Sequence, residues 1–331
     1  MDGSRAWARF VRNPSAIVGA TIVACLALFV VAAPAVSRHG PLDSDFVHGV
    51  AADKIPVGPG RDFPLGADRL FRDEFSRLAY GGRLSLLIAV AATTIASAIG
   101  AAVGIVAGYL EGQRARVPWS VLLAGAAFFA AVFAHHIAAV FLLAVGLVAF
   151  IRRFPSPRLD VDGLLMRLVD LLLAFPFLLL VMFLGAAREG TSALTIFVTL
   201  GLTGWVGIAR VVRGKTMQVR TFEYVIASRA LGQSTFGVIA RHVLPNVLDA
   251  LLVSSTLLVA QMIVADSVLS YLGVGIAPPT PTWGRMLYEG QDYYLAAPWL
   301  VAAPGATILL AVWGFNMLGE GLRDALDPHR T

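Results

Sequence analysis

Long apolar runs recur along this chain, and they constrain its fold more than any other feature. An α-helix needs ~20 apolar residues to cross the ~30 Å hydrocarbon core of a bilayer. Eight runs approach or exceed this length, at about 15–36, 84–109, 118–134, 137–151, 164–186, 193–212, 247–272 and 298–318. The sequence therefore predicts an all-α, polytopic membrane protein.

The composition supports a membrane protein over the alternatives. Of the 331 residues, 57% are hydrophobic and only 14% are charged, too few to keep a chain of this size dispersed in water. A membrane β-barrel would show short segments of alternating polarity, and none is seen. The net charge of +5 could indicate nucleic acid, but the basic residues flank apolar runs, so no nucleic-acid partner is expected. Membrane lipid is expected to surround the chain.

The first apolar run is interpreted as an uncleaved membrane helix. Arg5, Arg9 and Arg12 precede it, as in a signal peptide, but the run is longer than the ~7–15-residue core of such signals. Residues 1–36 are assigned to a cytosolic segment and this first helix, and 37–83 to a proline-containing external loop. Residues 84–331 then form the main transmembrane domain.

The distribution of basic residues predicts the orientation. With the amino terminus inside, 17 basic residues fall on the inner side: Arg5, Arg9, Arg12, Arg114, Arg116, Arg152, Arg153, Arg158, Arg167, Arg210, Arg213, Lys215, Arg220, Arg229, Arg241, Arg323 and Arg330. The short outer loops hold only Arg188 and Arg285. Cytoplasmic loops of membrane proteins carry this excess of Lys and Arg. Both termini are therefore expected in the cytosol.

The segment 117–152 is predicted to be an inserted apolar hairpin. A single helix over it would be ~50 Å long and would place Arg114 and Arg152 on opposite sides of the membrane. A hairpin keeps both inside. His135 and His136 then lie at its apex, and two ligands alone make no metal site, so no metal is expected.

Gly100, Gly104 and Gly108 recur at every fourth position of the second run. Such a stripe lets a neighbouring helix approach closely. A helix that is merely rich in small residues would show the same spacing, so the sequence leaves both interpretations open.

The stretch ARVVRGKT at 209–216 resembles a phosphate-binding loop in its last three residues. Such a loop needs glycines between a strand and a helix, so that backbone N–H groups can surround a phosphate. Ala209 replaces the first glycine, and the stretch lies where an apolar run leaves the membrane. The chain is predicted to bind no nucleotide.

The longest inner loop follows, within 214–246. Glu223 to Leu231 can form a short helix, with Gly232 as a left-handed C-terminal residue. Ser234 can cap a second helix whose apolar positions Phe236, Ile239 and Val243 share one face. Such a stiff bend in the cytosol predicts a docking surface. A helix lying on anionic lipid would carry more basic residues.

Several motifs resemble those of ABC importer permeases. EYVIASRALG at 223–232, followed by Ile239 and Leu244-Pro245, resembles their EAA coupling loop. RNPSAIVGA, LAYGGRLSLL, RLVDLLLAFPFLLL, DSVLSYLGVGIAPPTPTWGRMLYEG and FNMLGEGLRDALDP are similar to the dipeptide/oligopeptide/nickel permease family, in particular its C-type subunit. The likeness covers nearly the whole chain except about 114–158. Tyr224 and Val225 depart from the two alanines that follow the glutamate.

The resemblance implies a heteromeric importer of peptides or a related small solute in the bacterial plasma membrane. Its partners would be a homologous second permease, two ATPase subunits that use ATP and Mg, and an external solute-binding protein. This chain would be no enzyme and would bind no cofactor. It would have six family crossings plus the hairpin. The ATPase-coupling residues would be Glu223, Tyr224, Ala227, Ser228, Arg229, Ala230, Leu231 and Gly232.

An external motif departs from the family. The usual pattern is G-T-D-x-x-G-R-D, whereas this chain has Ala67, Leu70 and Phe71 within GADRLFRD. Those departures leave the role of the motif open.

Five residues in the apolar runs are candidates for the translocation pathway: Asp170, Phe175, Pro176, Asp266 and Asn316. Asp170 follows Arg167 by one helical turn, so the two can form a structural pair, although intramembrane acids are commonly functional. Pro176 can kink its helix. None of these residues identifies a solute.

Two other functions would require different sequence features or a different energy source. An intramembrane enzyme would need paired acids, a serine with a base, or an HExxH helix in the bilayer. His39, His48, His242 and His329 all lie in loops or the tail. A passive channel would transport without ATP.

Overall fold

The computed structural model describes residues 3–37, 39–51, 55–116, 158–186 and 192–326. Its elements are α1 (Gly3–Arg12), α2 (Pro14–Val36), α3 (Glu74–Leu110), β1 (Arg114–Arg116), β2 (Arg158–Asp160), α6 (Val161–Leu173), α7 (Phe177–Ala186), α8 (Ala193–Val219), α9 (Glu223–Ala230), α10 (Thr235–Val238), a π-helical turn (Ile239–Val243), α11 (Leu244–Tyr271), α12 (Trp283–Gly290), a 3-10 turn (Gln291–Tyr293) and α13 (Trp299–Leu326). The hairpin predicted at 117–152 lies outside the described residues.

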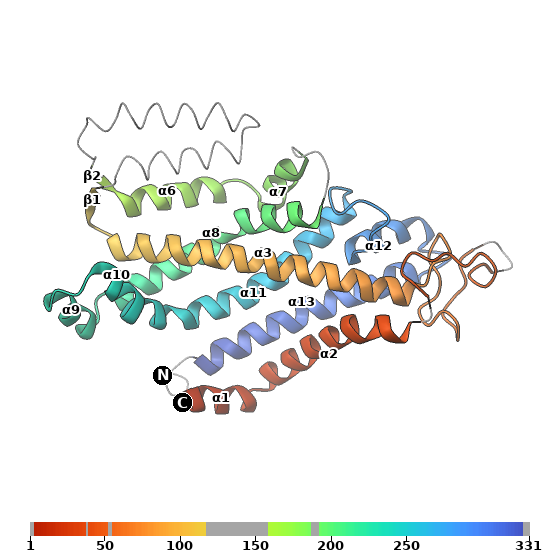
Figure 1. Ribbon diagram of the computed structural model, residues 1–331, viewed down its shortest axis with the longest axis horizontal. Helices are drawn as coiled ribbons and strands as arrows, with labels where there is room; N and C mark the ends of the chain where they lie inside the picture. The colour runs from red at the N-terminus through yellow and green to blue at the C-terminus, as the bar shows by residue number, and fades with distance from the viewer. Residues whose placement is uncertain (1–2, 38, 52–54, 117–157, 187–191, 327–331) are drawn as a thin grey trace.

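The long helices run side by side in an elongated bundle (Figure 1). Among the described residues, five helices are long and apolar enough to cross a membrane, and the number is six when the bent pair α6–α7 is counted as one span. These six spans correspond to the predicted runs other than the two assigned to the hairpin. The prediction of an all-α, polytopic bundle is confirmed, with one short strand pair added.

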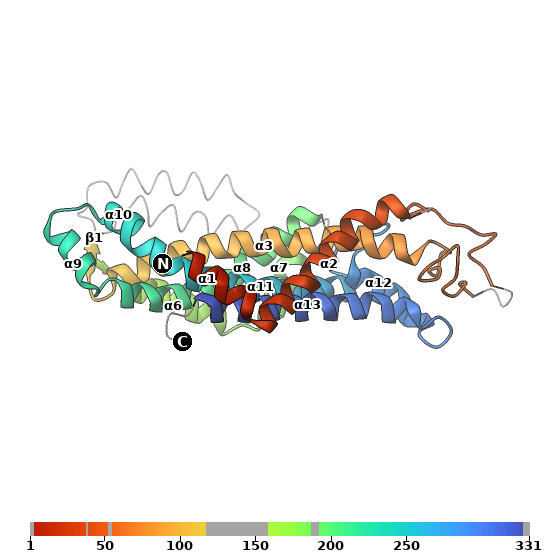
Figure 2. The same ribbon diagram turned by 90° about the horizontal axis from the view of Figure 1, so that it is seen from below.

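The two ends of the bundle carry different structures (Figures 1 and 2). One end holds α1, the end of α13, the β1–β2 ribbon and the bend formed by α9 and α10. The other holds the loop between α2 and α3, together with α12. Because the basic residues of the predicted inner loops lie at the first end, we call it the inner end.

The β1–β2 ribbon lies at the base of the inserted segment. Arg114 pairs with Asp160 and Arg116 with Arg158 in an antiparallel register. The residues before and after the inserted segment therefore lie side by side at the same end of the bundle. Helix α6 therefore starts at the same end of the bundle at which α3 finishes.

The glycine stripe of α3 is where α8 approaches most closely. A Cβ atom at Gly104 would lie 2.6 Å from the Ala209 carbonyl oxygen, and one at Gly108 would lie 2.6 Å from the Arg213 carbonyl oxygen. Only hydrogen atoms fit at these positions, so the helix backbones themselves are in contact. The structure thus supports the interpretation in which the glycine stripe allows close packing of two helices.

The helix predicted to start at residue 84 begins ten residues earlier, at Glu74. The Asp73 side chain caps it by accepting from the N–H groups of Phe75 and Ser76. The apolar pattern missed this turn because its charged residues are buried in a polar cluster at the end of the bundle opposite the inner end, described below. A helix of 37 residues is about 55 Å long, well over the ~30 Å core.

Candidate functional site

The inner bend consists of α9, α10 and the π-helical turn between α8 and α11. Helix α9 ends in a Schellman motif, in which the N–H of Gly232 donates to the Arg229 carbonyl (3.0 Å) and the N–H of Gln233 donates to the Ser228 carbonyl (3.2 Å). Gly232 has a φ of +82°, the left-handed conformation predicted for it. Ser234 caps α10 by accepting from the Gly237 N–H. The local geometry predicted for the bend is therefore present.

Two arginines fasten the bend to the inner end of α3. The Arg229 Nε donates to the Tyr109 hydroxyl at 2.9 Å, and its guanidinium lies 4.3 Å from the centre of the Tyr109 ring. Arg220 forms an ion pair with Glu111 and donates to the backbone carbonyls of Tyr109 and Glu111. Val225, which belongs to α9, is fully buried. A displacement of the bend would therefore move α3 with it.

The solvent-facing side of the bend carries apolar side chains. Leu231 is 89% exposed and Phe236 is 81% exposed, while Ile226 and Tyr224 are about half-exposed. Glu223, Ala227, Ala230 and Gly232 also lie at the surface, whereas Ser228 and Arg229 are partly buried. Large apolar residues held this far out of the bundle by a rigid bend fit a protein docking surface better than a solvated loop.

The prediction that Phe236, Ile239 and Val243 share one apolar face of the second helix is partly wrong. Phe236 is exposed, and Val238 and Val243 are the fully buried positions. The reason is the π-helical turn over Ile239–Val243, which inserts extra residues into the repeat and shifts the inward face.

Asp170 is paired, but with a different partner from the one predicted. It forms an ion pair with Arg210 of α8, not with Arg167 of its own helix, and both side chains of this pair are more than half exposed. One turn away on α8, Arg213 donates to both carboxylate oxygens of Asp162 at 2.6 Å. Two ion pairs therefore join α6 to the inner half of α8.

Phe175 and Pro176 lie at a break in the span predicted over 164–186. Helix α6 ends at Leu173, α7 starts at Phe177, and their axes differ by 85°. Phe175 is 58% exposed at this corner. Non-helical backbone at membrane depth is tolerated where it faces protein or a water-filled cavity, so the corner is suited to line a passage.

Asp266 and Asn316 are enclosed to different degrees. Asp266 is fully buried, with Ser85 of α3 as its polar neighbour. It therefore does not face an open passage in this conformation. Asn316 is partly buried in α13, and within the described part of the chain its side chain forms no hydrogen bond, unlike the cross-helix bond expected of it.

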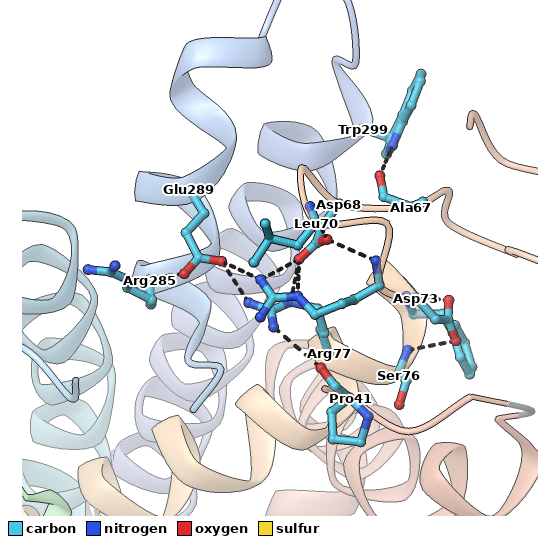
Figure 3. A network of polar contacts seen from close by, with 12 residues as sticks. Pro41, Ala67, Asp68, Leu70, Asp73, Ser76, Arg77, Arg285, Glu289 and Trp299 are labelled. Atoms are coloured by element: carbon cyan, nitrogen blue, oxygen red, sulfur yellow. Dashed lines mark hydrogen bonds and ion pairs between the residues drawn. The ribbon is translucent and has the colours of Figure 1, made fainter. Parts of the chain in front are cut away.

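At the outer end, a buried charge cluster joins the external loop to α3 and α12 (Figure 3). Its members are Asp68, Arg72, Arg77, Arg285 and Glu289. The Arg77 Nη2 lies 2.7 Å from Glu289 Oε2 and its Nε lies 3.2 Å from Asp68 Oδ2, while Arg72 contacts both acids. Arg285 contacts Glu289 at 3.1 Å. Sequence reasoning missed this cluster because Arg77 and Glu289 are 212 residues apart.

The cluster gives the altered external motif a structural role. Asp68 accepts from the N–H groups of Leu70 and Arg72, which shapes the turn. Phe71 stands where the family pattern has glycine, yet it keeps a φ of +61° and packs edge-on against Phe46. Burial raises the pKa of the neighbouring Asp73 carboxyl above its ordinary value, although Ser37 and two backbone N–H groups donate to it.

The nucleotide-loop interpretation is excluded by position, since residues 209–216 lie inside the continuous helix α8. A helix has no free N–H groups in its interior to surround a phosphate. In the part of the chain that the structure describes, no three His, Cys, Asp or Glu side chains gather as metal ligands.

Comparison with known proteins agrees with this arrangement. The family described as "Binding-protein-dependent transport system inner membrane component" matches residues 143–331, and the "N-terminal TM domain of oligopeptide transport permease C" matches residues 3–49. The dipeptide transport system permease protein DppC of Bacillus subtilis is 34% identical over 98% of this chain and 84% of its own. The oligopeptide transport system permease proteins OppC of Bacillus subtilis and Escherichia coli are each 32% identical over 97% of this chain, covering 87% and 89% of theirs.

Proposed function

Because the chain belongs to the family of binding-protein-dependent transport system inner membrane components, and is thus a membrane permease of an ABC importer, we propose how it works and what it carries. It forms half of a translocation pathway for peptides. The bend formed by α9 and α10 receives the movement of an ATPase subunit. The solute assignment rests on the relatives, whose names are those of dipeptide and oligopeptide permeases.

The exposed, rigid bend is the observation that carries the coupling proposal. Leu231 and Phe236 supply apolar contact area on its outer side. Arg229 and Arg220 hold its inner side against the end of α3. Since the backbones of α3 and α8 touch along the glycine stripe, a force on the bend would move both helices together.

The same proposal fixes the partners and the orientation. A homologous second permease completes the pathway, and an external solute-binding protein delivers the peptide to the outer end. Two ATPase subunits bind ATP and Mg²⁺ and dock at the inner end, so this chain itself carries no cofactor. Both termini then lie in the cytosol of a bacterium, and the protein resides in its plasma membrane.

Reconstitution tests the proposal. The permease pair, the ATPases and the solute-binding protein are placed in proteoliposomes, and uptake of a labelled dipeptide is measured with and without ATP. We expect uptake only with ATP and all subunits present. Uptake that is independent of ATP would indicate a passive channel, and cleavage of the peptide would indicate an intramembrane enzyme; either result would refute the proposal.

The docking surface is tested separately. A Leu231→Glu change should greatly reduce co-purification of the ATPases, because burying a charge against an apolar groove is costly. Leu295→Glu is the matched control, since Leu295 is 82% exposed at the outer end, where no ATPase binds. Equal ATPase recovery with both variants would contradict docking at the bend.

A further inference from the structure

Helix α1 has two chemically distinct faces. Trp7, Phe10 and Val11 are spaced three and four residues apart and therefore share one side of the helix. Arg9 and Arg12 are three residues apart and lie on the opposite side, where Arg12 is exposed. Trp7 is 66% exposed and Val11 is 48% exposed, so the protein itself leaves much of the apolar side uncovered.

The position of α1 limits what can cover this apolar face. Asn13 ends α1, and α2 starts directly afterwards at Pro14 as a membrane span. Figure 2 shows α1 leaving the axis of α2 at this corner. Ile17 and Val18 in the first turns of α2 are also exposed. The apolar side of α1 therefore adjoins one end of a candidate membrane span, next to other exposed apolar side chains.

The corner itself is fixed by one side chain. The Asn13 side-chain oxygen Oδ1 accepts from the N–H groups of Ser15 and Ala16 and so caps α2. Its amide nitrogen donates to Asp324 near the end of α13, at 3.1 Å. The junction between α1 and α2 is thus hydrogen-bonded to α13, which holds the start of α2 in place relative to the bundle.

We propose that α1 is an interfacial anchor that binds anionic phospholipid of the inner leaflet. Trp7, Phe10 and Val11 insert among the upper acyl chains, where tryptophan is favoured. Arg12, exposed on the opposite side, contacts phosphate-bearing headgroups, to which its positive charge is complementary. The occupant is lipid and not protein because the apolar side is continuous with a membrane span, while the charge matches the negative surface of the cytoplasmic leaflet.

The charged side is tested by hydrogen exchange of the assembled importer in nanodiscs. The discs contain phosphatidylcholine alone or mixed with phosphatidylglycerol, and protection of the α1 amides is compared. We expect greater protection with phosphatidylglycerol. Arg12→Gln should reduce that gain by about fivefold, since one basic residue near an anionic surface contributes on this scale. Arg61→Gln, which removes an exposed charge from the loop at the opposite end of the molecule, should leave it unchanged. Equal protection in both lipids would overturn the proposal.

The apolar side is tested through the fluorescence of Trp7, taken as the difference between the wild-type protein and Trp7→Phe because the chain has six tryptophans. Phospholipids with brominated acyl chains should quench this emission, and aqueous acrylamide should not. Quenching by acrylamide alone would place the helix in water. A Trp7 signal that changes only when the ATPases are added would place it against protein. Either result would overturn the lipid assignment.

Discussion

Replacing Gly232 by alanine isolates the contribution of backbone conformation to the inner bend. Gly232 has a φ of +82°, and a Cβ atom added there would meet nothing within 4 Å. The substitution therefore introduces no clash. Its cost is that of holding a side-chain-bearing residue in the left-handed region, about 1–2 kcal/mol.

This cost falls on the last turn of α9. The N–H groups of Leu231, Gly232 and Gln233 donate to carbonyls of that turn. A destabilisation of this size makes opening of the turn more frequent by about 5- to 30-fold. Hydrogen exchange of these three amides should accelerate by the same factor, and the amount of peptide imported per ATP hydrolysed should fall.

Gly273 provides a matched control at the opposite end of the molecule. It ends α11 in the same motif, with a φ of +81°, and a Cβ atom there would also meet nothing within 4 Å. Gly273→Ala should accelerate exchange at the outer end only and leave the coupling ratio unchanged. If Gly232→Ala left exchange at the bend unaltered, or if both variants lowered the coupling ratio equally, the argument for a stiff coupling bend would fail.

Three further predictions concern stability. Glu289→Gln should lower the free energy of unfolding by about 3–5 kcal/mol, because it removes one of the two buried acids that pair with Arg72 and Arg77 and the acid that pairs with Arg285; an unchanged thermal midpoint in detergent would contradict this. Gly104→Ala should destabilise by about 1–3 kcal/mol, since the new methyl group meets the backbone of α8 at 2.6 Å. Gly305→Ala, whose nearest neighbour is 3.8 Å away, should not, and equal melting of these two variants would refute the close-packing argument. Hydrogen bonds from the backbone N–H and side chain of His48 lower the pKa of Asp45 from 3.8 to about 2. The turn should therefore be intact above pH 3.8 and lose stability as the pH falls towards 2; an NMR titration of this carboxyl near 3.8 would show the bonds to be absent.

The sequence predicted the parts that depend on local chemistry. The apolar runs gave the six spans found among the described residues. Glu223, Gly232 and Ser234 gave the helix, its left-handed end and the next cap, since each is decided by residues within one or two turns. These motifs also supplied the family, which the comparisons confirm.

Other features were decided by packing between distant segments. The start of α3 at Glu74 could not be read from hydropathy, because the charges of its first turns are hidden by Glu289 and the loop containing Asp68. The partner of Asp170 lies on another helix, where two faces of α6 and α8 happen to meet. The exposure of Phe236 depends on a π-helical turn, which the spacing of apolar residues in the sequence does not predict.

The amino-acid sequence by itself thus determined that the chain crosses a membrane and where it bends between two spans, and its charges predict that this bend and both termini are cytosolic. Those properties follow from transfer of apolar segments into lipid, from charge at their ends and from short-range backbone preferences. The tertiary structure alone decided which charges are paired and buried. An ion pair depends on the approach of two atoms to within a few ångströms, and that distance is fixed only when all the helices are packed together.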